Sequence, residues 1–263
     1  MLSLLEPSVA GLQFSSHIPS AALHEIDGVA RGLGVCHEGR CIVGEGMGIG
    51  APLALLNGRA IFPLDVENFQ SGDRLTRRFH LNGLSKKYVG NAPVDVPYKR
   101  IRSQLAPLYL KSSRFRPFFK YLMTVRSLIG VKSKYRKIRS IGYVDIAYEH
   151  GSHEVRVQVD ASRLAADRFL IANELNGQLF NHLSINNSVN LTKIPPWLEI
   201  SGSEVRLTAP SLRLSFCLRG VEGCKMFAGR EVLGKRLNWA GVSYLASPGI
   251  GRVDYEVVFR END

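Results

Sequence analysis

The stretch VCHEGRCIVGEGMGIGAPLALLNGRAIFPLD, Val35–Asp65, decides the fold class of this chain. It contains two turn signals: Glu38-Gly39 between VCH and RCIV, and Asn57-Gly58 between LALL and RAIF. A two-residue type I′ turn needs positive φ at both central residues, so Asn-Gly between apolar runs strongly indicates a β-hairpin. We therefore expect two consecutive hairpins, the second with Leu56 opposite Arg59.

Glycine stands at every second position over Gly44–Gly50, between the two turns. In an extended strand these glycines share one face, which leaves bare backbone open to close approach by a ligand or another element. The segment Gly46–Ala51 also fits the G-x-G-x-x-A pattern of dinucleotide sites, with Asp65 19 residues after its first glycine. Such a site needs a helix after the glycines. Only Pro52–Leu56 precedes the next turn, so we prefer a strand or tight loop here, with a dinucleotide site as the alternative.

The remainder of the chain from Ile141 onward also has the pattern of β-strands. Alternating apolar and polar residues are separated by turn-forming segments such as His150-Gly151-Ser152 and Ser201-Gly202-Ser203. Regular hairpin spacing favours an antiparallel β-sandwich or barrel over parallel βαβ units. We therefore predict a single, mainly β domain over residues 1–263, built from hairpins, with a basic, partly helical insertion at residues 101–139.

The positive charge of the chain is concentrated in its centre. The net charge is +11, from 34 Lys and Arg against 23 Asp and Glu. Residues Arg74–Val144 hold 18 of the basic residues and one acid, Asp95, which leaves 16 basic and 22 acidic residues elsewhere. The central block thus carries +17 and the rest of the chain −6. A solvated basic face is one interpretation, and an anionic partner is the other.

Within this block, Ile101–Gly130 is the best helical candidate. Apolar residues recur at three- and four-residue spacing over Phe118–Ile129, which is typical of an amphipathic helix. Basic residues on its other side and in Val131–Arg139 suit the neutralisation of phosphates, and an interleaved tyrosine suits stacking on a base. The predicted anion-binding residues are Arg114, Arg116, Lys120, Arg126, Lys132, Lys134, Tyr135, Arg136, Lys137 and Arg139.

The same basic pattern also suits a membrane surface, an acidic protein subunit, or a helix packed on the sheet with its basic side in water. No run approaches the roughly 20 apolar residues of a membrane-spanning helix. The start, MLSLLEPSVAGLQF, lacks the basic region of a signal peptide. We therefore expect a cytoplasmic, non-enzymatic binding protein for an anionic partner, with nucleic acid ahead of a membrane surface. A structural protein that docks an acidic subunit is a further alternative.

The four cysteines form two local pairs, and each pair brackets a turn-like segment. Cys36 and Cys41 flank the Glu38-Gly39 turn, where a two-residue loop places them directly opposite one another. Cys217 and Cys224 bracket the sequence LRGVEG. Free thiols and two disulfides are both open interpretations, and a zinc site would need all four cysteines to converge. We expect neither a metal nor a cofactor.

Catalytic motifs are absent from the sequence, which contains no G-x-S-x-G, H-E-x-x-H or P-loop. Several acids lie at apparent strand ends, and two carboxylates that meet in a cleft can hydrolyse glycosides. The alternative function is therefore a β-sandwich enzyme that acts on a carbohydrate or related small molecule. Its weak catalytic candidates are Glu45, Asp65 and Glu174.

Overall fold

The structure is a computed structural model. It describes residues 12–15, 31–44, 46–57, 59–88, 132–151, 153–186, 189–191, 194, 197–200, 204–233 and 237–261. The strands are β1 (Leu12–Ser15), β2 (Gly34–His37), β3 (Arg40–Val43), β4 (Gly48–Leu56), β5 (Arg59–Ser71), β6 (Arg74–Tyr88), β7 (Lys132–Lys137), β8 (Tyr143–His150), β9 (Glu154–Asp160), β10 (Arg168–Asn176), β11 (His182–Ile185), β12 (Val189–Leu191), β13 (Leu198–Ile200), β14 (Glu204–Ala209), β15 (Leu214–Arg219), β16 (Cys224–Leu233), β17 (Leu237–Ala246) and β18 (Arg252–Glu261). One short 3₁₀-helix, η2 (Pro210–Leu212), precedes β15.

The described strands form two antiparallel sheets. β1, β2 and β3 form a three-stranded sheet, and the other fifteen strands form one large sheet. The order of the large sheet is β12-β11-β14-β15-β18-β9-β8-β6-β5-β4-β10-β17-β16-β13, with β7 paired to β6 beside this path. The prediction of a mainly β, antiparallel, hairpin-built chain is confirmed. The described ranges contain no α-helix, and therefore no helix that is long and apolar enough to cross a membrane.

The predicted helix at residues 101–130 lies outside the described residues. The end of the predicted insertion is described, and it is part of the large sheet. Residues Lys132–Lys137 form β7, which pairs antiparallel with the second half of β6.

Both predicted hairpin turns are confirmed. Glu38 and Gly39 have φ values of 48° and 75°, as a type I′ turn requires. Asn57 has a φ of 50°, and the next hairpin sets Leu56 opposite Arg59 as expected. These turns fix the registers of β2–β3 and β4–β5.

The glycine-rich segment continues directly as β4, which leaves no place for the helix of a dinucleotide site. Its bare backbone is instead approached by other parts of the chain. A Cβ on Gly48 would lie 2.3 Å from the backbone nitrogen of Gly32. At Gly50, with a φ of +71°, a Cβ would lie 2.9 Å from the hydroxyl oxygen of Tyr148. The alternating glycines therefore allow close packing of chain segments.

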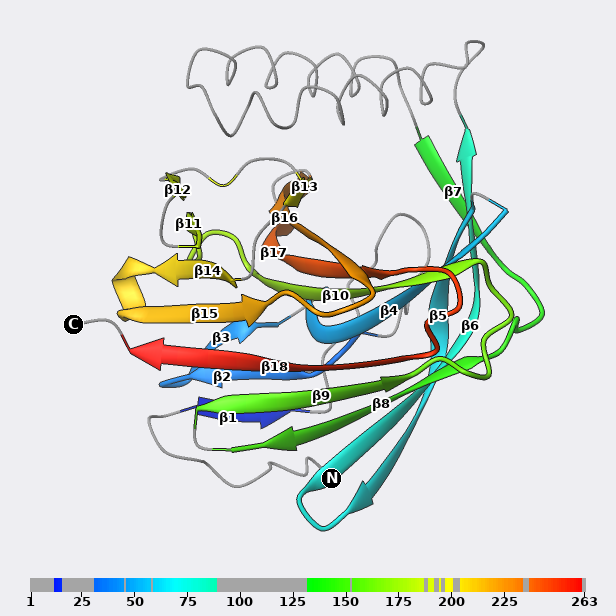
Figure 1. Ribbon diagram of the computed structural model, residues 1–263, viewed down its shortest axis with the longest axis horizontal. Coiled ribbons are helices and arrows are strands. Elements are labelled where there is room, and N and C mark those ends of the chain that lie inside the picture. Colours follow the sequence, from blue (N-terminus) through cyan, green and yellow to red (C-terminus); the bar gives the residue numbers. More distant parts are fainter. Residues whose placement is uncertain are drawn as a thin grey trace.

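The large sheet bends, so that β4, β10 and β17 face β8 and β18 across a shared core (Figure 1). The Tyr255 hydroxyl of β18 donates to Asn173 Oδ1 of β10 at 2.8 Å. The rings of Tyr255 and Tyr244, on β17, lie 4.9 Å apart. The Tyr148 hydroxyl of β8 donates to the Ile49 carbonyl of β4 at 3.0 Å. Burial raises the pKa of all three tyrosines, which keeps these hydroxyls protonated as donors.

Strand β6 runs along one side of the molecule, from its hairpin with β5 to its pairing with β7 (Figure 1). It is 15 residues long and changes partner along its length. Its first half, Arg74–His80, pairs with β8, and its second half, Gly83–Tyr88, pairs with β7. On its other edge, β6 pairs with β5 from Arg74 to Leu84. This shared strand positions the candidate site.

Candidate functional site

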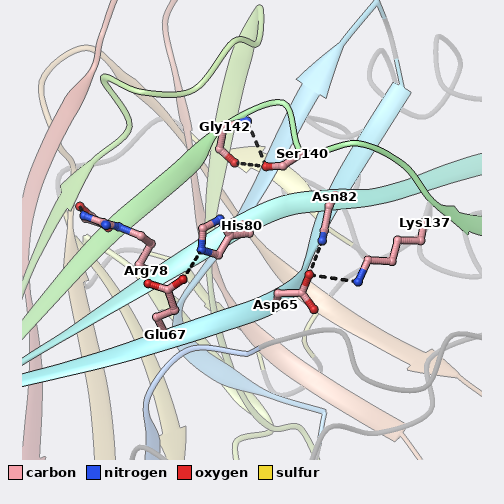
Figure 2. A network of polar contacts seen from close by, with 9 residues as sticks. Asp65, Glu67, Arg78, His80, Asn82, Lys137, Ser140 and Gly142 are labelled. Carbon is pink, nitrogen blue, oxygen red and sulfur yellow. Dashed lines mark hydrogen bonds and ion pairs between the residues drawn. The ribbon is translucent and has the colours of Figure 1, made fainter.

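A network of polar side chains lies on the outer face of β5 and β6 and extends to β7 and β8. Figure 2 shows its members on β5, β6 and β7. The turn at Gly72-Asp73 sets the register between β5 and β6, which places Glu67 opposite Arg78 and Asp65 opposite His80. Cross-strand partners in an antiparallel pair share one face, so alternate residues of both strands line this surface. The members of this β5–β6–β8 network are Asp65, Glu67, Arg78, His80, Asn82, Lys137, Tyr143 and Asp145.

Asp65, a predicted catalytic candidate, is exposed and has two polar partners. Asn82 Nδ2 donates to Asp65 Oδ2 at 2.5 Å, and Lys137 Nζ lies 3.2 Å from the same oxygen. Asn82 is itself buried, and its Oδ1 accepts a hydrogen bond from the backbone N–H of Leu64. The hydrogen bond from Asn82, followed by that from Lys137, holds the pKa of Asp65 below its ordinary value. Lys137, which was predicted to bind an anion, is thus paired with an acid of its own chain.

Glu67 and His80 form a second pair beside Asp65. His80 Nε2 lies 2.9 Å from Glu67 Oε1, and the His80 ring meets the ring of Tyr143 edge-on at 6.1 Å. A carboxylate in this position fixes the orientation of the imidazole ring.

Arg78 completes the network with a bidentate ion pair. Its Nε and Nη2 donate to the two carboxylate oxygens of Asp145 at 2.8 and 2.9 Å. Its Cζ lies 4.2 Å from the ring centroid of Tyr143 and 5.4 Å from that of Phe69. The hydrogen bonds from Arg78 to Asp145 raise the pKa of this guanidinium further, so it stays charged. At 47% exposure, Phe69 is the one exposed large hydrophobic residue in the described part of the chain.

Two other cations in the first half of β6, Arg74 and Arg77, also have partners. Arg74 Nη1 lies 3.2 Å from Glu149 Oε1 on β8. Arg77 points to the opposite face of β6, where it is buried and donates to the backbone carbonyls of Arg31 and Gly32 at 2.8 and 2.7 Å. Burial lowers the pKa of Arg77, but an arginine remains charged under ordinary conditions. The β6–β8 half of the basic block therefore presents little unpaired positive charge.

The β6–β7 ladder has a different composition. Its register sets Lys86 opposite Lys134, and Tyr88 opposite Lys132. Two basic segments that are more than forty positions apart in the sequence thus become neighbours. The predicted residues Lys132, Lys134, Tyr135, Arg136 and Lys137 all lie on β7. Arg139 follows it and is exposed, whereas Arg114, Arg116, Lys120 and Arg126 lie outside the described residues.

Glu174, another catalytic candidate, lies on β10 and is buried with only 8% exposure. Arg31 Nη1 lies 3.3 Å from Glu174 Oε2, and Arg31 Cζ lies 5.5 Å from the ring centroid of Trp239. The register of the sheet places a glycine on each side of Glu174, Gly48 on β4 and Gly241 on β17. The carboxylate therefore lies between two positions of bare backbone.

The structure describes two of the three catalytic candidates, Asp65 and Glu174, and their surroundings differ. Asp65 is exposed on β5, Glu174 is buried on β10, and Glu45 lies outside the described residues. The described residues also hold no group of three or more His, Cys, Asp or Glu placed to bind a metal ion.

Sequence reasoning missed the Glu67–His80 and Arg78–Asp145 pairs. A usable signal for the first was the Gly72-Asp73 turn. Counting outward from Ser71 opposite Arg74 gives Glu67 opposite Arg78 and Asp65 opposite His80, so Glu67 and His80 are diagonal neighbours on one face. The second pair needs β6 to lie beside β8, which no turn specifies.

Comparison with known proteins gives a distant structural likeness. No family model matches the chain, and no curated protein matches it. Among solved structures, the chain is similar to 4-alpha-glucanotransferase from Thermococcus litoralis, with 11% sequence identity and a TM-score of 0.37. The match covers 81% of this chain and 27% of that chain. A likeness at this TM-score carries no argument about fold or activity.

Proposed function

We propose that this chain is a non-enzymatic binding protein for an anionic partner, with nucleic acid as the leading candidate. The observation that supports this most is the register of the β6–β7 ladder, which sets Lys86 opposite Lys134. Like charges directly opposite one another destabilise an antiparallel pair. A polyanion that lies along the ladder relieves this repulsion and releases its own counterions.

The two halves of β6 support this proposal by their contrast. In the β6–β8 half, Arg74 and Arg78 have carboxylate partners on β8. In the β6–β7 half, neither strand contains an acid, because β7 has the sequence KSKYRK and the end of β6 has the sequence SKKY. Tyrosines on both strands of this ladder suit stacking on exposed bases. We therefore assign the anion-binding role to the β6–β7 ladder, with Arg139 beside it.

The proposal is tested by a salt series of binding to fluorescently labelled single- and double-stranded DNA. We expect affinity to fall steeply with salt, since the logarithm of the binding constant has a slope of about −0.7 to −0.9 per neutralised phosphate. The variant K132E/K134E/R136E should weaken binding on the order of tenfold or more at low salt, and flatten the slope.

The matched control is R163E/R168E/R219E, which makes the same charge change at exposed arginines outside the basic block. Equal loss in both variants would mean that net charge alone drives binding, and would overturn the assignment to the ladder. Binding to anionic liposomes but not to either DNA would replace nucleic acid with a membrane surface. No binding to any polyanion at low salt would overturn the proposal as a whole.

The fold itself is proposed to be a sandwich, not a barrel. Contacts between β10 and β18, such as that of Asn173 with Tyr255, join the two facing halves of the large sheet. The sheet path also has two distinct ends, β12 and β13, and a closed barrel has none. Both observations support two packed layers.

A further inference from the structure

The β2–β3 hairpin holds two cysteine side chains against one another. Its register sets Cys36 directly opposite Cys41, and their Sγ atoms lie 2.6 Å apart. A disulfide bond is about 2.05 Å long, so only a small movement separates this thiol pair from a bond. The Glu38-Gly39 turn fixes the register, so the contact follows from the hairpin and needs no distant element to maintain it.

The other two cysteines provide an internal comparison. Cys217 lies on β15 and Cys224 on β16, and these strands are not neighbours in the large sheet. Cys217 pairs with Arg206 and Val258, and its exposure is only 3%. All four cysteines are free thiols, but only the hairpin pair combines contact with access to solvent, because Cys41 is exposed.

We propose that Cys36 and Cys41 form a reversible thiol–disulfide site that reacts with small-molecule disulfides. The exposed Cys41 thiolate attacks one sulfur of the small disulfide, forms a mixed disulfide and releases one small thiol. Cys36 then loses its proton and attacks Cys41 Sγ, which releases the second small thiol. The protein pair gives up two electrons and two protons, and the small disulfide is reduced to two thiols.

The order of the two attacks follows from the surroundings of the sulfur atoms. Burial, together with the neighbouring Cys41, raises the pKa of the Cys36 thiol to about 12, so Cys36 is the poorer first nucleophile. The contribution of Cys41 comes from its hydrogen bond and its charge. Both disappear once Cys41 is in a mixed disulfide, and Cys36 then becomes a better nucleophile for the second step.

The test uses the full reduced chain, incubated with oxidised glutathione under native conditions. Remaining thiols are counted and then located by alkylation and peptide mass mapping. We expect two of the four thiols to disappear, with a Cys36–Cys41 cross-link that lacks two hydrogen atoms and restores both thiols on reduction. The variant C36S should stop at a glutathione adduct on Cys41. The variant C217S/C224S should form the cross-link as fast as the parent chain.

Three results would overturn the proposal. One is the survival of all four thiols in excess oxidised glutathione. Another is a stable adduct on Cys41 in the parent chain without the cross-link. The third is a cross-link that includes Cys217 or Cys224. Circular dichroism of the oxidised chain provides the fold control, and we expect an unchanged β spectrum because the bridge joins residues already opposite one another.

Discussion

Two ion pairs in this molecule have nearly the same length but very different surroundings. The Arg31–Glu174 pair joins the segment before β2 to β10 at 3.3 Å, and its side chains are 10% and 11% exposed. The Arg74–Glu149 pair joins β6 to β8 at 3.2 Å, with exposures of 48% and 40%. Water solvates the second pair whether or not the contact forms, whereas the first pair is mostly surrounded by protein. Burial, not distance, therefore decides how much each pair contributes to the free energy of unfolding.

The two regions also differ in what holds each arginine in place. Arg31 lies over the Trp239 ring, and its backbone carbonyl accepts a hydrogen bond from the buried Arg77. Its Nε has no hydrogen-bond partner in the described part of the chain. Arg74 donates instead to exposed groups, Glu149 and the side-chain oxygen of Gln158. One region is a specific buried arrangement, and the other is a screened surface.

The largest expected effect comes from breaking the buried pair. The change R31M should lower the free energy of unfolding by about 3 kcal/mol, because it removes the Arg31 guanidinium from its ion pair with the buried Glu174 carboxylate. The matched change R74M at the surface should cost less than about 1 kcal/mol. Urea unfolding of both variants at neutral pH measures the difference. Equal losses would show that the two regions do not differ in the way that burial predicts.

A second, smaller effect is expected at Asn173 in the core between β10 and β18. Its Oδ1 accepts hydrogen bonds from the Gly50 backbone at 3.0 Å and the Tyr255 hydroxyl at 2.8 Å. The change N173A leaves both donors buried without an acceptor and should cost about 2–3 kcal/mol. The control is N176A on the same strand, whose side chain accepts a hydrogen bond from the exposed N–H of Gln178. We expect urea unfolding to show a loss below about 1 kcal/mol for this control.

The sequence was informative wherever one turn set the structure. Asn57-Gly58 and Glu38-Gly39 specify their hairpins through backbone dihedral angles alone, and the position of Cys36 opposite Cys41 follows from the second. The same reasoning reaches the β5 and β6 half of the network by counting from Gly72-Asp73. Local information was sufficient in these places because each contact depends on one short loop.

The order of strands that are distant in sequence could not be obtained in this way. Glu174 and Arg31 are 143 positions apart, and their pairing requires β10 to lie between β4 and β17. The apolar pattern of β10 decides which of its residues are buried, but several other strands have a similar pattern. The pattern alone therefore does not select β4 and β17 as its neighbours. Charge counting likewise found the basic block but not Glu149 and Asp145 of β8, which pair with the arginines of its β6–β8 half.

The smallest expected effect tests the exposed network through pH. The pKa of Asp65 is lowered in the folded chain, chiefly by the hydrogen bond from Asn82 and then by that from Lys137. The group therefore stabilises the fold above its unfolded pKa, near 4, and this contribution disappears as the pH falls through the lower folded pKa. Because Asp65 is exposed, the contribution should be below about 1 kcal/mol.

The variant D65N should therefore be slightly less stable than the parent chain at pH 7, and the difference should vanish at acid pH. Urea unfolding from pH 7 to pH 3 measures this convergence. The variant K137Q sharpens the test, because Asn82 is the larger cause of the shift and remains in place. NMR titration should then find the Asp65 pKa raised by K137Q, but still below its ordinary value. A complete return of the Asp65 pKa to its ordinary value would assign the whole shift to Lys137. The shift would then depend on charge alone, as we expect for the exposed Arg74–Glu149 pair.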